Sequence, residues 1–343
     1  MMKILIFRSK YDKIVIKEVM SVDRENSIEE LIAAADTQEA KLDTYCKIVL
    51  SHKEVLAWIL KSCVKEFADC SIKDIAYKYI EGEPEISSET VHRNESIIGM
   101  SSEDMALNEG IVTYDLKFGA TAPMGELSLI INVEAQNDFY PGYPIIKRGM
   151  YYCGRMLSAQ YGTEFASSHY EKLKKVYSIW ICLNPPKNRM NTITRYSFKE
   201  ENLVGHVHEN ELDYDLMAVT IICLGDEKAE NSSGVLRMLE VLFSSEIEKI
   251  EKRDILRDEF CMTMTKKYEG EVSEMCNFSK GILEKGMEKG MEKGMEKGFK
   301  NANISSIKNL MKNMNWSIEQ AMSAIGLDEK DKIHYISIID KEI

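Results

Sequence analysis

The sequence predicts an α/β protein in which helices flank a mixed β-sheet. Two apolar runs, VYSIWICL at 176–183 and LMAVTIICL at 216–224, are continuous, which is typical of strands buried on both faces. Two further strands, Thr113–Phe118 and Leu127–Val133, flank a segment with two glycines and a proline, so they are expected to form a hairpin. Segments with helical spacing accompany these strands, and that combination indicates an α/β fold.

Three segments are expected to be helical. Leu42–Phe67 has apolar residues at helical spacing and is expected to break in two near Ser51. A helix is expected over 145–161, and two more over 232–268. At the start of the first segment, Asp43 lies one turn from a lysine, Lys47, so the two side chains can share a helix face.

The ends of the chain are expected to be separate from this core. Residues 1–27 predict an accessory N-terminal hairpin, to which no function is assigned, and residues 28–270 predict the main domain. Residues 281–300 repeat E-K-G-M with a period of four and predict a helical spacer, because a four-residue stripe winds around a helix of 3.6 residues per turn. Residues 301–343 predict a small helical module with a capping box at Ser317.

Composition limits the class of protein. No apolar run approaches the length of a membrane span, and the N-terminal segment lacks the features of a signal peptide, so a cytoplasmic protein without membrane contact is expected. The 8 cysteines form no C-x-x-C pair, so reduced core thiols are expected. The net charge of -12 argues against a generally basic nucleic-acid binder.

Three polar residues of the hairpin form the candidate site. Asp115 lies on the first strand, and Glu134 and Gln136 close the second, where they project to the same face. If the strands pair, Asp115 comes beside them. Hard cations such as Mg²⁺ take oxygen ligands of this kind, and a bound cation can activate water and stabilise a phosphate in transfer. The alternative is that these acids are merely solvated at the end of a strand.

Several short motifs occur in an order that resembles one nuclease family. An acid on one strand, a hairpin and an apolar strand ending in E-x-Q resemble the core of PD-(D/E)XK nucleases. More narrowly, they resemble the recombination-promoting nuclease and putative transposase (Rpn-like) branch, in which Gln often stands in the lysine position. DTYCK at 43–47 resembles that family's D-x-x-F-K segment, and KRGMYY at 147–152 matches a helix with Arg and Tyr. The likeness extends from Leu42 to the C-terminus and includes the E-K-G repeats.

The resemblance implies a restriction-endonuclease-like fold and a metal-dependent DNA endonuclease, acting in recombination, DNA mobility or defence. Asp115, Glu134 and the backbone carbonyl of Ala135 would bind Mg²⁺, with Mn²⁺ as the alternative cation. Gln136 would orient or bind water. The first core helix of that family often contributes an acid, a role that falls on Asp43 here; a surface ion pair with the neighbouring lysine is the alternative.

The chain departs from the family's pattern at two positions. A tyrosine rather than a proline precedes Asp115, and Gln136 replaces lysine, so the usual positive charge is missing. Lys117, on the strand face of Asp115, or Lys147 would substitute for it. Lys147 and Arg148 open the helix after the hairpin and would meet a scissile phosphate. The alternative for both is a solvated basic side chain.

A second hypothesis is a nuclease fold that has lost catalysis and serves as a protein-interaction or assembly module. The acidic net charge and the missing lysine favour it, whereas the intact acid pair disfavours it. The repeat at 281–300 would then promote a homo-oligomer, because its glycines allow helix backbones to approach. DNA is the expected partner under the first hypothesis.

Overall fold

The computed structural model describes most of the chain, namely residues 32–33, Ala35, 37–82, 84–86, 103–106, 110–123, 127–225, 234–327 and Tyr335. The hairpin expected in residues 1–27 lies outside the described residues. The chain divides into two compact units, Met1–Ser279 and Lys280–Ile343. The sheet and the candidate site belong to the first unit.

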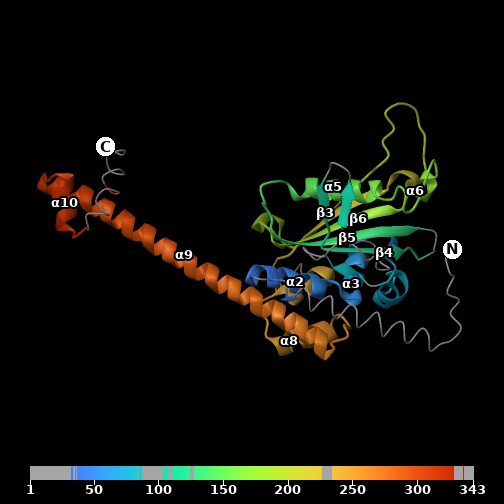
Figure 1. Ribbon diagram of the computed structural model, residues 1–343, viewed down its shortest axis with the longest axis horizontal. Coiled ribbons are helices and arrows are strands. Elements are labelled where there is room, and N and C mark those ends of the chain that lie inside the picture. The colour runs from blue at the N-terminus through green and yellow to red at the C-terminus, as the bar shows by residue number, and fades with distance from the viewer. Residues whose placement is uncertain are drawn as a thin grey trace. The chain divides into compact units, whose positions relative to one another are not determined.

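A six-stranded mixed sheet forms the centre of the first unit (Figure 1). Its strands lie in the order β1 (Glu85–Ile86), β4 (Leu116–Thr121), β5 (Ser128–Asp138), β6 (Lys175–Asn184), β8 (Met217–Cys223) and β7 (Thr192–Ser197). β1, β4 and β5 pair antiparallel, β6 and β8 run parallel to β5, and β7 closes the far edge antiparallel to β8. A second sheet joins β2 (Glu103–Ala106) to β3 (Gly110–Thr113).

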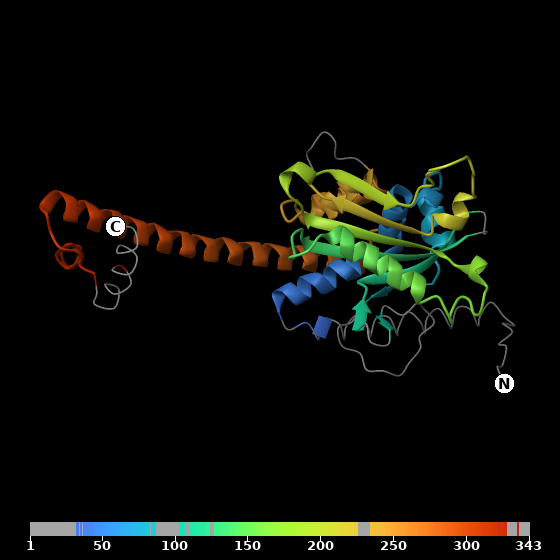
Figure 2. The same ribbon diagram turned by 90° about the horizontal axis from the view of Figure 1, so that it is seen from above.

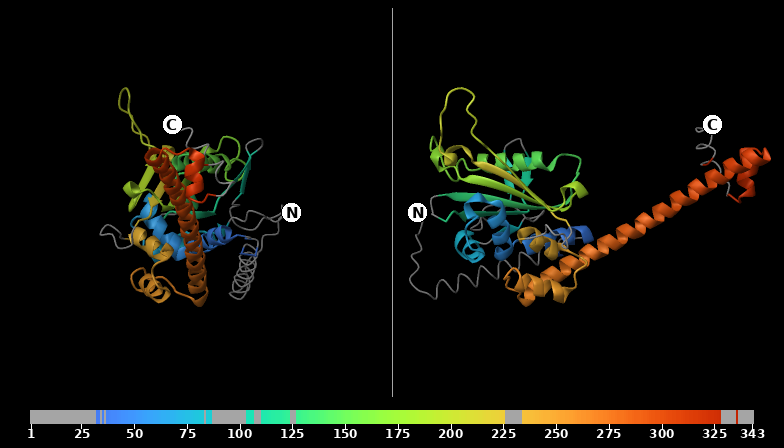
Figure 3. Two further views of the ribbon diagram at one scale, coloured as in Figure 1. Left: turned by 90° about the vertical axis from the view of Figure 1, so that its left-hand side faces the viewer. Right: turned by 180° about the vertical axis from the view of Figure 1, so that it is seen from behind.

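Helices cover both faces of the larger sheet (Figure 2 and Figure 3). α5 (Ile145–Ser158) packs on one face, against β6 and β8. α2 (Gln38–Leu50), α3 (Lys53–Cys63) and α7 (Gly234–Phe243) contribute to the core on the other face, and α8 (Lys249–Asp258) packs against α7. The predicted α/β architecture, a mixed sheet flanked by helices, is therefore confirmed.

Short helical turns complete the connections of the first unit. They are η1 (Lys65–Phe67), α4 (Ile72–Asp74), η2 (Ile75–Tyr79), η3 (Tyr170–Lys172), η4 (Lys187–Arg189) and α6 (Glu211–Tyr214). The predicted break after the first helix is confirmed at Ser51, between α2 and α3. The helices expected over 145–161 and 232–268 are confirmed as α5, α7 and α8.

Each face of the sheet has its own apolar core, because alternate residues of a strand point to opposite sides. Leu116 and Phe118 of β4 face the core shared with α2 and α3, whereas Ile130 of β5 and Trp180 of β6 face α5. β6 and β8 are buried on both faces, which explains their continuous apolar sequences. β7 is an edge strand, and all of its residues are exposed.

The central hairpin forms, but its first strand begins later than the sequence pattern predicts. The chain leaves β3 at Thr113, bends at Asp115 and enters β4 at Leu116. The residues predicted as one strand are divided between β3 and β4, which belong to different sheets. The alternating sequence pattern alone does not show where one strand ends and the next begins. Asp115 consequently lies at a bend between the two ladders.

The second unit contains the later part of α9 (Lys266–Met314) and α10 (Ile318–Ala324). α9 runs without interruption through the E-K-G-M repeat, so the repeat and the segment up to Met314 form one helix. The predicted capping box is confirmed: Ser317 Oγ accepts a hydrogen bond from Gln320 N at 3.2 Å, and Gln320 Oε1 accepts one from Ser317 N at 3.0 Å. Ile307, Ala321, Met322 and Tyr335 form a small core.

Two expectations from composition can be compared with the fold. The cysteines are free thiols, and most of them are buried, as the sequence predicts. None of the helices in the described part of the chain combines the length and the apolar character needed to cross a membrane.

The close packing of α5 on the sheet can be tested at Gly149. A Cβ atom at this position would lie 2.7 Å from Val219 Cγ1 and 3.0 Å from Trp180 Nε1. Gly149→Ala is therefore expected to lower the free energy of unfolding by about 1–3 kcal/mol, because overpacking outweighs the gain in helix propensity. Gly154→Ala is the matched control on the same helix, where nothing lies within 4 Å. It is expected to be neutral or to stabilise by up to about 1 kcal/mol in urea unfolding. Equal effects of the two substitutions would contradict this packing.

Candidate active site

Asp115 and Glu134 meet at the point where the hairpin ladder ends. Leu116 pairs with Val133, so the next position along the ladder would set Asp115 opposite Glu134. Asp115 N donates a hydrogen bond to Glu134 Oε1 at 3.0 Å, and Ala135 N donates one to Asp115 Oδ2 at 3.0 Å. Each carboxylate thus accepts a backbone N–H from the other strand. We call Asp115 and Glu134, with this exchange, the carboxylate pair.

The carboxylate pair is largely removed from solvent. Glu134 is 3% exposed, and Asn132 Nδ2 donates a further hydrogen bond to its Oε1 at 2.6 Å. Burial raises the pKa of Glu134 well above its usual value, and the charge of Asp115 raises it further. The hydrogen bond from Asp115 N and the charge of Arg148 act in the opposite direction without cancelling this rise. Burial also raises the pKa of Asp115.

A lysine of the first helix completes the cluster. Lys47 Nζ lies 3.2 Å from Asp115 Oδ1 and 2.7 Å from Asp43 Oδ2. Burial lowers the pKa of Lys47, but the charges of Asp115 and Asp43 outweigh burial and leave this pKa raised. Asp43 forms an ion pair with Lys47, which is the alternative to a site role that the sequence offered for this acid. Because Lys47 also contacts Asp115, the same ion pair connects Asp43 to the carboxylate pair.

The two remaining candidates from the hairpin, Gln136 and Lys117, differ in their surroundings. Gln136 lies on the same strand face as Glu134, and its Nε2 donates to the carbonyl of Asp138 at 2.6 Å. Lys117 is 9% exposed, and its ammonium lies 5.0 Å from the centre of the Tyr114 ring.

Lys147 and Arg148 lie in the first turn of α5, as predicted, but they differ in environment. Lys147 is exposed, whereas Arg148 is half-buried among aromatic side chains. Arg148 donates to Tyr152 Oη through Nη2 at 2.7 Å and to Tyr143 Oη through Nη1 at 3.0 Å. Its guanidinium also lies 5.1 Å from the centre of the Trp180 ring. Burial and the charge of Glu134 raise the pKa of Tyr152 to about 12, so its hydroxyl stays protonated.

Sequence reasoning did not assign a site role to Lys47 or to Asn132. Asn132 stands two residues before Glu134, so the strand period already places the two side chains on one face. The spacing of Asp43 and Lys47 indicated their ion pair, but not the contact of Lys47 with Asp115. That contact depends on how α2 docks onto the sheet, which no local pattern encodes.

Asp115 and Glu134 are the residues of this cluster whose oxygens could hold a divalent cation. Two carboxylates are brought together in a sheltered position, and Asn132 Oδ1 beside them is buried and accepts no hydrogen bond within the described structure. An unsatisfied buried acceptor is expected where a ligand or water completes a site. Over the described ranges, no group of three or more His, Cys, Asp and Glu side chains is arranged to hold a metal ion. Mg²⁺ commonly keeps several waters and takes only one or two carboxylates from a protein, which is the number that the pair provides.

No protein-family model matches the chain, and no curated protein or solved structure matches it either.

Proposed function

We propose that this chain is a metal-dependent DNA endonuclease with a restriction-endonuclease-like core. The carboxylate pair, with a buried lysine beside it, is the observation that carries the proposal. The order of elements supports the fold assignment. α3, β1, β4, β5, α5 and β6 come in this order along the chain as a helix, three antiparallel strands, a helix and a parallel strand, with β2 and β3 of the smaller sheet between β1 and β4. This is the order expected from the resemblance to PD-(D/E)XK nucleases.

In this proposal Asp115 and Glu134 bind Mg²⁺ or Mn²⁺, with the carbonyl of Ala135 as a further protein ligand. A bound divalent cation would supply Lewis-acid activation of water and would neutralise charge on the phosphate. The raised pKa values of both carboxyl groups support this role, because their largest cause is burial, which removes both acids from water at a cost in solvation. A bound cation would offset that cost.

Lys47 is the residue best placed to provide the positive charge that Gln136 lacks. Its ammonium contacts Asp115, and its raised pKa keeps it protonated, so it acts as a fixed charge rather than as a base. A charge in this position would stabilise the extra negative charge that develops on a phosphate during transfer. Lys117 and Lys147 are less favourable substitutes, because one lies over the Tyr114 ring and the other is exposed on α5.

Two other side chains have supporting roles in the proposal. Gln136 would orient the attacking water through its amide, since it shares the strand face of Glu134. Arg148 would hold a DNA phosphate near the carboxylate pair, with its guanidinium oriented by Tyr143 and Tyr152. The net charge of -12 implies that DNA contacts are local to these basic side chains, so binding should weaken with added salt.

Nicking of supercoiled plasmid tests the proposed function. The purified protein is expected to nick DNA with Mg²⁺ or Mn²⁺ and to be inactive in EDTA. Asp115→Ala and Glu134→Ala should each lower the rate by roughly 100-fold or more, since each removes one of the two carboxylates proposed to bind the cation. Lys47→Met should lower it by a similar factor, because the developing phosphate charge loses its partner.

The matched control is Lys73→Met, which removes an exposed lysine from the short helix α4. It is expected to retain the full rate of nicking. Circular dichroism of every variant separates loss of the site from loss of the fold. Metal-dependent nicking that persists in Asp115→Ala and Glu134→Ala would contradict the assignment of the site.

Assembly is a second candidate function, and one feature of α9 favours it. Met291, Met295 and Phe299 recur every fourth residue of the repeat and are 70%, 55% and 67% exposed. Large apolar side chains at this density on a helix surface favour burial against a partner. We propose that the partner is a second copy of this helix, which would make the chain a homo-oligomer.

Sedimentation equilibrium tests the assembly. The native protein is expected to self-associate at micromolar concentration, whereas a triple variant, Met291→Ser with Met295→Ser and Phe299→Ser, should be monomeric. Met314→Ser is the control, because it removes an exposed Met of α9 outside the repeat. A monomeric native protein would exclude this use of the repeat.

A further inference from the structure

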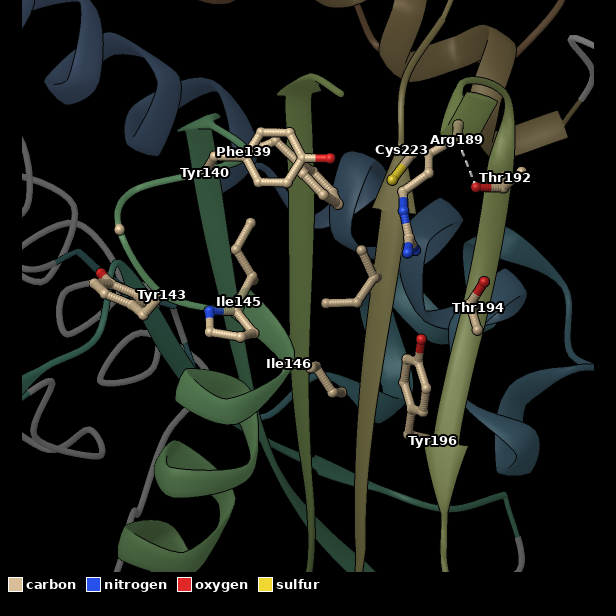
Figure 4. A pocket seen from close by; sticks show the side chains of 13 residues that line it. Phe139, Tyr140, Tyr143, Ile145, Ile146, Arg189, Thr192, Thr194, Tyr196 and Cys223 are labelled. Carbon is tan, nitrogen blue, oxygen red and sulfur yellow. Dashed lines mark hydrogen bonds between the residues drawn. The ribbon is translucent and has the colours of Figure 1, made fainter. Parts of the chain in front are cut away.

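A cavity of about 460 Å³ opens at the carboxyl ends of the parallel strands, beside the edge strand β7 (Figure 4). Its walls come from the turn after β5, the first turn of α5, the end of β8, and η4 with β7. Open α/β sheets bind ligands in this position, outside the carboxyl ends of their strands. The volume lies in the range of sites that hold a small organic group.

The lining of this cavity is aromatic and carries a single charge. Among the described residues that line it, four carry aromatic rings, namely Phe139, Tyr140, Tyr143 and Tyr196, and Arg189 is the one with a charged side chain. The Arg189 guanidinium lies 5.6 Å from the centre of the Phe139 ring. Figure 4 shows Arg189 and the hydroxyl end of Tyr196 directed toward the same open space. No carboxylate is among the described residues that line the cavity, although the chain as a whole is acidic. The surface therefore suits a flat aromatic group with a phosphate nearby.

The three tyrosines are accessible to such a group. Tyr140 is 70% exposed, Tyr143 is 45% exposed and Tyr196 is 37% exposed. Exposed rings gathered around one cavity offer stacking faces without any rearrangement of the apolar core. Thr192 and Thr194 of β7 add hydroxyl groups at the rim, which can hydrogen-bond the edge of a stacked ring.

The cavity is connected to the carboxylate pair through β5 and through Arg148. Phe139 follows Glu134 by five residues, which corresponds to roughly 17 Å along an extended chain. Tyr143 at the cavity wall accepts a hydrogen bond from Arg148, whose charge also acts on Glu134. One strand of nucleic acid could therefore contact the cavity and the carboxylate pair together.

We propose that this cavity holds one unstacked base of single-stranded DNA, stacked on the aromatic rings, with the adjacent phosphate on Arg189. Stacking on exposed aromatic side chains and contact with Arg is how proteins bind single strands without reading their sequence. Bases of an intact duplex are stacked on their neighbours and must be extruded before they can enter such a cavity. The inference rests on the proposed nuclease function and names its substrate class, which is single-stranded or unpaired DNA.

Fluorescence anisotropy in EDTA tests the proposal, because cleavage cannot then occur. A labelled single-stranded oligonucleotide is expected to bind roughly 10-fold more tightly than the same sequence as a duplex. Tyr196→Ala should weaken single-strand binding by roughly 10-fold, since one stacking face is lost, and Tyr196→Phe should preserve it. Tyr196 lies on the exposed edge strand, so truncation there leaves the core intact.

Two controls separate stacking from other causes. Tyr170→Ala removes a more exposed tyrosine, 62% exposed, that lies outside the cavity, and this variant should bind the single strand as the native protein does. An oligonucleotide of the same length made of abasic sites should bind more weakly than the one with bases. Equal binding of the abasic and normal strands, or unchanged binding by Tyr196→Ala, would overturn the proposal. Displacement of the strand by a free deoxynucleoside monophosphate at similar concentration would also overturn it, in favour of a nucleotide site.

The outcome of this experiment is independent of the plasmid assay. Binding that depends on Tyr196 without any metal-dependent nicking would support the cavity and count against the nuclease. Nicking without a contribution of Tyr196 to binding would support the nuclease and overturn the cavity as a base-binding site.

Discussion

The exchange of hydrogen bonds between Asp115 and Glu134 is the interaction on which the candidate site depends. Asp115 occupies a bend between two sheets, so its backbone N–H donates to the Glu134 carboxylate. The N–H of Ala135 in turn donates to the Asp115 carboxylate. Buried backbone donors must find acceptors, and here the two acids provide them. The backbone thereby holds the carboxyl groups beside each other, although their charges repel.

Burying the two acids beside each other costs free energy, and the surrounding structure offsets only part of that cost. Burial is the largest cause of the raised pKa of both acids; the charge of Asp115 adds to the rise at Glu134, and the charge of Asp43 adds to the rise at Asp115. Lys47 and Arg148 only partly offset these effects. Buried like charges are costly, so a fold that retains them forgoes stability that a pair of apolar residues would give. Under the proposed function, a bound cation would offset this cost.

The carboxylate pair and the aromatic cavity lie at successive positions along β5. Its middle carries Glu134 toward the face covered by α5, and its end leads into Phe139 and Tyr140 at the cavity wall. Arg148 on α5 lies between them, since it hydrogen-bonds Tyr143 and acts on the charge of Glu134. A substrate that used both surfaces would be aligned by one strand and one helix, which are rigid supports.

Much of the fold could be predicted from sequence, because each element has a local signal. The runs that became β6 and β8 were apolar over a strand length, and Ser317 with Gln320 formed a capping box. The pairing of Asp115 with Glu134 followed from the hairpin. The contact of Lys47 with Asp115 and the aromatic cavity did not, because they join residues far apart in sequence through the docking of helices and edge strands.

The most direct test of the central claim is to measure Mn²⁺ binding, using electron paramagnetic resonance to determine the concentration of the free ion. The native protein is expected to bind one Mn²⁺ per chain. Asp115→Asn keeps the size of the side chain but removes its charge, and it should abolish this binding while the chain stays folded. Failure of the native protein to bind Mn²⁺, or equal binding by Asp115→Asn, would contradict the assignment of Asp115 and Glu134 as a cation site.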